Sequence, residues 1–247
     1  MALDLDLRRQ AASGLSGREL TQILFGKLMR KFGLATSKAQ DGRFHWTYEA
    51  VIDAVGPEAL CRTYLEQRDV RIYLQEITKK RTLREAADIG SGFGRMTPVL
   101  SEFSSKALGF EREPALVDTA CALNTNKAIE YRCIKSLSAL PLLDGTIDFV
   151  LIFTVLQHLP DHLAGKVACE ARRILSSTGF LLVVEQTDEF DTSGDISDES
   201  ALIQRGRSVE KYEDLFKPLK LIKTSPRIVE PTYRVRHCGT YMLFNGS

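Results

Sequence analysis

The most informative segment of this 247-residue chain is Ala87-Asp88-Ile89-Gly90-Ser91-Gly92-Phe93-Gly94-Arg95. An apolar run ends in an acid, three glycines follow at alternate positions, and a helical pattern resumes at Met96. We therefore expect a strand over residues 83–89, a tight turn over residues 90–94 and a helix over residues 95–103. Glycine lets the backbone approach a ligand where a Cβ atom would clash, and the N–H groups at a helix start face that ligand. The stretch predicts a cofactor-binding loop.

The glycine spacing distinguishes two kinds of cofactor. A dinucleotide-binding loop reads G-x-G-x-x-G, but here the third glycine comes one position early and Arg95 stands in the final place. The pattern Asp-x-Gly-x-Gly-x-Gly instead resembles the first motif of the class I S-adenosylmethionine (SAM) dependent methyltransferases. In that family the acid lies near the methionine end of SAM. The resemblance implies cofactor contacts from Asp88, Gly90, Ser91, Gly92, Gly94 and Arg95.

A second cofactor residue is expected where the next strand, residues 106–110, ends. Glu111 follows that strand, about 20 residues after the first glycine, as the ribose-binding acid does in dinucleotide folds. A carboxylate can accept hydrogen bonds from both hydroxyls of a ribose. We expect Glu111 to bind the ribose and Arg112 beside it to reach the adenine, the alternative for Glu111 being an ordinary surface acid.

Residues 129–150 resemble the segment of the same family that links strands three and four, including Leu140-Pro141 and the turn Asp144-Gly145. The family often has an acid after strand three that accepts from the adenine amino group. This chain has Ser136 and Leu137 there instead. The resemblance implies that the Ser136 hydroxyl and the Leu137 backbone N–H take over the adenine contacts.

The segment from Phe153 to Asp161, which contains Val-Leu-Gln-His-Leu, resembles the family motif after strand four. The resemblance implies that Phe153 and Thr154 border the methionine part of SAM and the transferred methyl group, with Gln157 beside the acceptor. An imidazole can take a hydroxyl proton near neutral pH, so His158 is a candidate general base. The alternative is a structural histidine at the start of a helix.

Strand and helix patterns alternate from residue 83 onward, which predicts an α/β fold. We expect a doubly wound, mainly parallel seven-stranded sheet with helices on both faces and an antiparallel last strand. Residues 81–247 would form the SAM-binding domain, and residues 1–80 a helical N-terminal extension or cap. The expected strands are residues 83–89, 106–110, 128–134, 147–153, 179–185, 219–224 and 239–245.

The acceptor pocket is expected where three distant segments meet at the carboxyl ends of the strands. One is the aromatic cluster around Trp46, the second follows strand four, and the third is the basic hairpin with Arg234, Arg236 and His237. The alternatives are a hydrophobic plug for the first and an ordinary charged hairpin for the last. The candidate general bases are His158, His237 and Glu185.

We expect methyl transfer to a small molecule, at a hydroxyl rather than an amine, with a sugar or an anionic metabolite as the acceptor. The alternatives are N-methylation and a non-catalytic SAM-fold scaffold, whereas Arg95 disfavours a nicotinamide-dependent oxidoreductase. The acidic loop at residues 188–199 is expected to be a solvated lid with no metal, the alternative being a site for a divalent cation with oxygen ligands.

The composition limits the partners and the compartment. The chain has 33 basic and 32 acidic residues, a net charge of +1, which disfavours a nucleic-acid binder. The first residues lack a signal-peptide pattern, and no apolar run is long enough to span a membrane. The five cysteines form no CxxC pair and are expected to be buried free thiols. A cytoplasmic protein is expected, of unspecified oligomeric state.

Overall fold

The computed structural model describes residues 57–79, 81–187, 206–228 and 237–246. The chain divides into two compact units, Met1–Leu60 and Cys61–Ser247. All the described residues except 57–60 belong to the second unit. The expected division into an extension over residues 1–80 and a domain over residues 81–247 stays a prediction.

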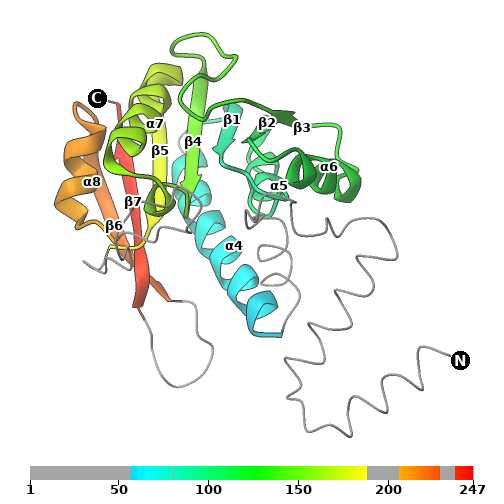
Figure 1. Cartoon of the computed structure of the whole chain (residues 1–247), viewed down its shortest axis with the longest axis horizontal. Coiled ribbons are helices and arrows are strands. Elements are labelled where there is room, and N and C mark those ends of the chain that lie inside the picture. Colours follow the sequence, from blue (N-terminus) through cyan, green and yellow to red (C-terminus); the bar gives the residue numbers. More distant parts are fainter. Residues whose placement is uncertain (1–56, 80, 188–205, 229–236, 247) are drawn as a thin grey trace, which may run out of the picture. The chain divides into compact units, whose positions relative to one another are not determined.

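The strands of the described chain form one seven-stranded sheet in the order β3-β2-β1-β4-β5-β7-β6 (Figure 1). Strands β1 to β5 pair in parallel, and β7 is antiparallel to both of its neighbours. This architecture confirms the expected fold class. The strands are β1 (Leu83–Ile89), β2 (Ser104–Glu111), β3 (Ile129–Cys133), β4 (Ile147–Phe153), β5 (Leu175–Glu185), β6 (Lys220–Ile228) and β7 (His237–Asn245).

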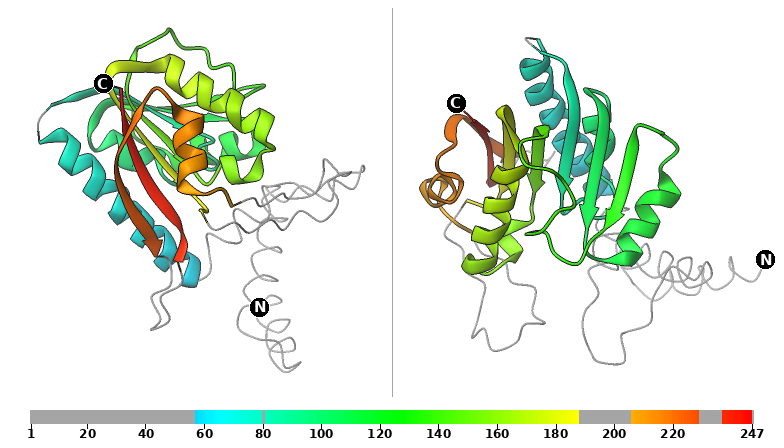
Figure 2. Two further views of the ribbon diagram at one scale, coloured as in Figure 1. Left: turned by 90° about the vertical axis from the view of Figure 1, so that its left-hand side faces the viewer. Right: turned by 90° about the horizontal axis from the view of Figure 1, so that it is seen from above.

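Helices cover both faces of the sheet, as the two further views show (Figure 2). Helices α7 and α8 pack on one face, α4 and α5 pack on the other, and α6 packs against β2 and β3. The helices are α4 (Pro57–Thr78), α5 (Thr97–Ser101), α6 (Pro114–Leu123), α7 (Asp161–Ile174) and α8 (Val209–Phe216), with a 3₁₀ turn η1 (Leu156–His158).

The position of the site follows from the winding of the sheet. All seven residues of β4 are buried, because a central parallel strand is covered by helices on both faces. The chain proceeds from β1 to β2 on one side and returns to β4 on the other. Ligands of such sheets bind where the strand order reverses, outside the carboxyl ends of the strands. The loops after β1 and β4 meet at that point.

Several boundaries differ from the sequence prediction for local reasons. Strands β1 and β4 have the expected bounds, but the helix expected over residues 95–103 is confined to α5, because the non-helical backbone of the turn continues through Met96. Strand β6 continues past the expected end, through Pro226. Proline is tolerated there because β6 is the edge strand of the described sheet.

The expectation of buried thiols was wrong for the four cysteines whose side chains the structure describes. All four are free, as expected, but each is exposed on the outer side of a helix or at the end of β3. They are Cys61, Cys121, Cys133 and Cys169. Among the described helices, none combines the length and the apolar character needed to cross a membrane.

Candidate functional site

The loop after β1 turns back onto the end of β2. The N–H groups of Gly90 and Ser91 both donate to the carbonyl oxygen of Phe110, at 2.8 and 3.0 Å. Gly90, Gly92 and Gly94 have φ values of 77°, 55° and 83°, a region that other residues enter at a cost. The glycines are therefore required by the path of the backbone.

The space around these glycines differs. A Cβ atom on Gly90 would lie 2.5 Å from a methyl carbon of Val155, and one on Gly94 would strike the Tyr131 ring, whereas Gly92 has no atom within 4 Å of that position. The Ser91 hydroxyl is buried, and no hydrogen-bond partner exists for it in the described chain. Open space at Gly92 and an unpaired hydroxyl beside it fit a loop that contacts a ligand.

Glu111, at the end of β2, lies directly beside this loop. Its Oε2 accepts the N–H of Gly92 at 3.0 Å, and its Oε1 accepts the N–H groups of Arg112 and Glu113 at 2.6 and 3.0 Å. Three backbone donors fix the carboxylate, and Oε2 keeps acceptor capacity for a ligand hydroxyl. The exposed Arg112 side chain is available at the same end of β2.

Asp88 lies beneath the loop, with 1% of its surface exposed. Its Oδ2 accepts a hydrogen bond from the Thr97 hydroxyl at 2.7 Å. Burial raises the pKa of Asp88 to about 7, although the Thr97 hydrogen bond and the Arg95 charge oppose this shift. A cationic ligand near this carboxyl would favour its ionised form, which suits the α-ammonium and sulfonium of SAM.

Ser136 and Leu137 lie in the segment after β3. The Ser136 hydroxyl is 2.8 Å from the Ser138 hydroxyl and accepts the Ser138 N–H at 3.2 Å. It therefore already takes part in hydrogen bonds within its own turn. The Leu137 side chain is buried. The structure brings both residues to the carboxyl end of the sheet, and the adenine contact stays a prediction.

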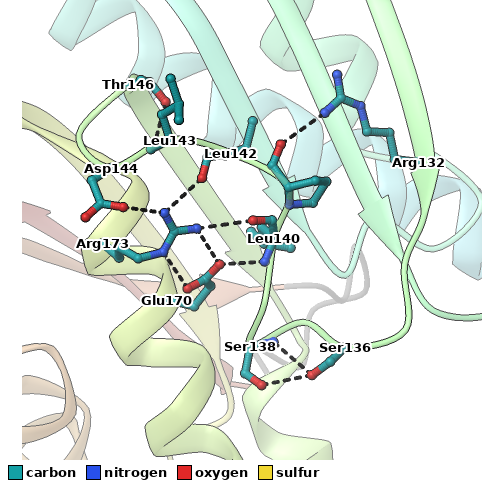
Figure 3. A network of polar contacts seen from close by, with 11 residues as sticks. Arg132, Ser136, Ser138, Leu140, Leu142, Leu143, Asp144, Thr146, Glu170 and Arg173 are labelled. Atoms are coloured by element: carbon teal, nitrogen blue, oxygen red, sulfur yellow. Dashed lines mark hydrogen bonds and ion pairs between the residues drawn. The ribbon is translucent and has the colours of Figure 1, made fainter.

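Two side chains of α7 hold the segment between β3 and β4 (Figure 3). Glu170 accepts the N–H of Leu140 at 2.5 Å, and Arg173 donates to the carbonyl oxygens of Leu140 and Leu142 at 3.2 and 2.8 Å. Arg173 also pairs with Asp144 at 2.6 Å. This network was not predictable from the sequence, because an acid and an arginine at positions i and i+3 of a helix usually form only a surface pair.

The exit of β4 is strained. Thr154 has φ 54°, a rare conformation for a β-branched residue, and its N–H donates to the Val184 carbonyl at 2.7 Å. Strain of this kind persists where the surroundings fix it, and it concentrates at functional sites. The buried Phe153 ring precedes it, so both expected methyl-site residues lie at the reversal point of the sheet.

Glu185, a candidate base, fixes the turn after β4. This fully buried carboxylate accepts the N–H groups of Val155 and Leu156 at 2.8 Å and that of Gln157 at 3.1 Å. Burial raises its pKa to about 7, although the three N–H groups oppose the shift. Both carboxylate oxygens therefore accept hydrogen bonds from backbone N–H groups at the start of η1.

Arg207 holds the same turn from its other end. Its guanidinium donates to the carbonyl oxygens of Leu156 and Leu159, each at 2.7 Å, and pairs with Asp161 at 2.7 Å. The side chain is 5% exposed. Sequence reasoning did not single it out, because one arginine after an acidic loop has no distinguishing pattern.

His158 ends η1 and is half-buried. The Gln157 Oε1 accepts the Gln186 N–H at 3.0 Å, which orients the amide so that its NH₂ group lies 3.2 Å from Nε2 of His158. We assign Nε2 as the acceptor of this bond and the proton to Nδ1 on that basis. Gln157 itself is 5% exposed and braces the end of β5.

Four expected features lie outside the described residues: Trp46, Arg234, Arg236 and the acidic loop over residues 188–199. The backbone of His237 begins β7, paired with Ile228. Within the described ranges no cluster of His, Cys, Asp and Glu could hold a metal ion. A surface hollow near Arg81 and Ser105 lies at the amino ends of β1 and β2. The glycine loop lies at the opposite, carboxyl end of β1.

Comparisons with known proteins find a matching family model and similar folds. A family model described as a methyltransferase domain matches residues 87–183. A SAM-dependent methyltransferase from Leishmania major is 18% identical with a TM-score of 0.61, over 74% of this chain and 72% of that chain. One from Methanosarcina mazei is 16% identical with a TM-score of 0.55, over 67% and 93%. The PH0226 protein from Pyrococcus horikoshii is 15% identical with a TM-score of 0.61, over 83% and 100%. No curated protein matches the sequence.

Proposed function

We propose that this chain, whose residues 87–183 match a methyltransferase domain model, is a class I SAM-dependent methyltransferase that methylates a hydroxyl group of a small-molecule acceptor. The observation that carries the hydroxyl acceptor is the position of His158, a titratable side chain on the turn that directly follows the strained residue Thr154. The balanced charge of the chain supports a small molecule rather than a nucleic acid.

The chain's own residues bind and orient the cofactor in this proposal. Glu111 accepts from the ribose, Ser91 and Gly92 contact the cofactor backbone, and Asp88 and Arg95 face the ammonium and carboxylate of its methionine end. Bound SAM supplies an activated methyl group, so the protein mainly aligns the reactants and excludes water. Arg112, Ser136 and Leu137 lie toward the adenine.

Proton removal is assigned to His158, which touches the acceptor through Nε2. The Gln157 amide occupies that nitrogen, so the acceptor hydroxyl must displace this hydrogen bond before the imidazole takes its proton. Glu185 and Arg207 act as positioning residues, because they hold the N–H and C=O groups of the same turn. Arg234 and Arg236 stay candidates for an anionic group on the acceptor, and Trp46 and His237 stay candidates for its pocket.

The test is the release of S-adenosylhomocysteine from SAM with a panel of paired acceptors, each hydroxylated compound matched by its amine. Turnover of the hydroxyl members supports the proposal. Turnover of the amines alone would replace it with N-methylation, which needs no base of this kind. Binding of S-adenosylhomocysteine with no product from any acceptor would favour a non-catalytic scaffold.

A further inference from the structure

A buried carboxylate on α4 joins three parts of the fold. Glu66 has 1% of its side chain exposed and forms ion pairs with Arg95, from the loop after β1, and with Arg227, from β6. The Nε of Arg227 donates to the same carboxylate at 2.9 Å. The neighbouring Gln67 donates to the Arg95 carbonyl oxygen at 2.8 Å. Helix α4 therefore holds both the side chain and the backbone of Arg95.

An aromatic ring completes this arrangement. The guanidinium carbon of Arg95 lies 5.0 Å from the centre of the Phe153 ring, and that of Arg227 lies 5.5 Å from it. Tyr241 meets Phe153 edge-on, with ring centres 6.4 Å apart, and stacks on Tyr73 at 5.7 Å. Two guanidinium groups over one ring repel each other unless an anion lies between them, and Glu66 is that anion.

Glu66 remains ionised in this setting. Burial alone would raise its pKa, but the charges and hydrogen bonds of Arg95 and Arg227 outweigh burial and hold the pKa of this carboxyl below its usual value. Removing one partner of such a buried group leaves the other charges without compensation. The position of Arg95 therefore depends on Glu66.

Arg95 keeps binding capacity after this pairing. A guanidinium has five N–H donors, and within the described ranges only its Nη1 is engaged, by Glu66. The side chain is 21% exposed, against 1% for Glu66, so the accessible part of the pair is cationic. The Arg95 charge also acts on the carboxyl of Asp88, which lies under the cofactor loop.

We infer that Glu66 is a positioning residue of the cofactor site, which holds Arg95 against Phe153 so that its unused donors bind the carboxylate at the methionine end of the cofactor. This inference rests on the proposed placement of that end between Asp88 and Arg95. It makes α4 a working part of the cofactor site rather than a separate covering element. The α-ammonium and the α-carboxylate would each meet a charge of opposite sign.

The test compares Glu66→Gln with Glu102→Gln by calorimetric titration of the folded proteins. Glu102 also pairs with an arginine of α4, Arg71 at 2.6 Å, but this pair is exposed and lies away from the glycine loop. We expect Glu66→Gln to weaken S-adenosylhomocysteine about tenfold or more, and Glu102→Gln to leave its affinity unchanged. 5′-Methylthioadenosine lacks the amino-acid end, and its affinity should be the same in both variants and the unaltered protein.

A double-variant comparison isolates the route through Arg95. Arg95→Gln should lower S-adenosylhomocysteine affinity, and adding Glu66→Gln should lower it no further, because Glu66 acts only through that guanidinium. The double variant also removes one of the two arginine charges that Glu66→Gln leaves without this carboxylate, which lowers the risk of misfolding. Equal losses for both ligands in Glu66→Gln, or a further loss in the double variant, would overturn the inference in favour of general support of the loop.

Failure of the proposed acceptor chemistry has a different signature. A protein that binds S-adenosylhomocysteine with the expected dependence on Glu66, yet methylates no hydroxyl, contradicts the proposed function and leaves this inference standing. A protein that methylates hydroxyls while Glu66→Gln binds S-adenosylhomocysteine normally contradicts the inference alone.

Discussion

The carboxylate of Glu111 accepts a hydrogen bond from the backbone N–H of Gly92 over 3.0 Å. This bond ties the end of β2 to the middle of the loop after β1. The bond places Glu111, which is proposed to bind the ribose, next to Gly92. Of the three glycines in this loop, Gly92 is the one whose Cβ position is open. Two of the following predictions test the two sides of this contact.

Gly92→Val should abolish S-adenosylhomocysteine binding while the protein stays folded. The new side chain would enter the open space beside the loop, and φ 55° adds a backbone cost of about 1–2 kcal/mol. Calorimetry and thermal unfolding measure the two effects separately. Gly165→Val is the matched control, because the Cβ position of that α7 glycine is also open but lies far from the loop. Undiminished affinity in Gly92→Val would remove the loop from the cofactor site.

Glu111→Ala should weaken S-adenosylhomocysteine by about 1.5–3 kcal/mol, the range of hydrogen bonds to a charged group. Titration calorimetry on the folded variant measures the change. An analogue without the two ribose hydroxyls serves as the ligand control, and it should bind the variant and the unaltered protein equally. A similar loss for both ligands would mean that Glu111 supports the loop and does not bind the ribose.

His158→Ala should lower turnover by about 10²–10⁴ with little change in SAM affinity if the imidazole takes the acceptor proton. The control is His162→Ala, an exposed histidine on the first turn of α7. Initial rates with an active acceptor, together with calorimetry, separate the two parameters. Normal turnover in His158→Ala would give that residue the structural role at the end of η1.

Asp88 should make the protein less stable as the pH rises. Its pKa is about 7 in the folded protein against 3.8 for the free group, so between these values the folded state binds more protons than the unfolded state. The free energy of unfolding therefore falls across this window, by up to about 1.4 kcal/mol per pH unit from this group.

Asp88→Asn removes the titration and keeps an acceptor for the Thr97 hydroxyl. Its stability relative to the unaltered protein should therefore improve steadily from pH 4 to pH 7 in urea unfolding experiments. A difference between the two proteins that is independent of pH would show that Asp88 is ionised in the folded state throughout this range.

The fold class could be predicted from the sequence, and so could the position of the glycine turn after β1. Alternating strand and helix patterns give a parallel sheet because each crossover must return across a face of the sheet. The run of six apolar residues and one acid in β4 identified a strand covered on both faces. The glycine spacing at residues 90–94 determined the turn, since φ is a local property. These signals depend on near neighbours in the chain, so sequence reasoning can find them.

Which buried charges lie in contact became apparent only from the folded structure. Glu66 and Arg227 are 161 positions apart and form one ion-paired cluster with Arg95, and nothing in the spacing of these residues indicates it. Glu185, which the sequence offered as a candidate base, likewise accepts hydrogen bonds from three N–H groups, because β5 ends beside the turn after β4. The sequence showed which residues carry charge, whereas strand order and register determined which of them lie close enough in a low-dielectric interior to act on each other.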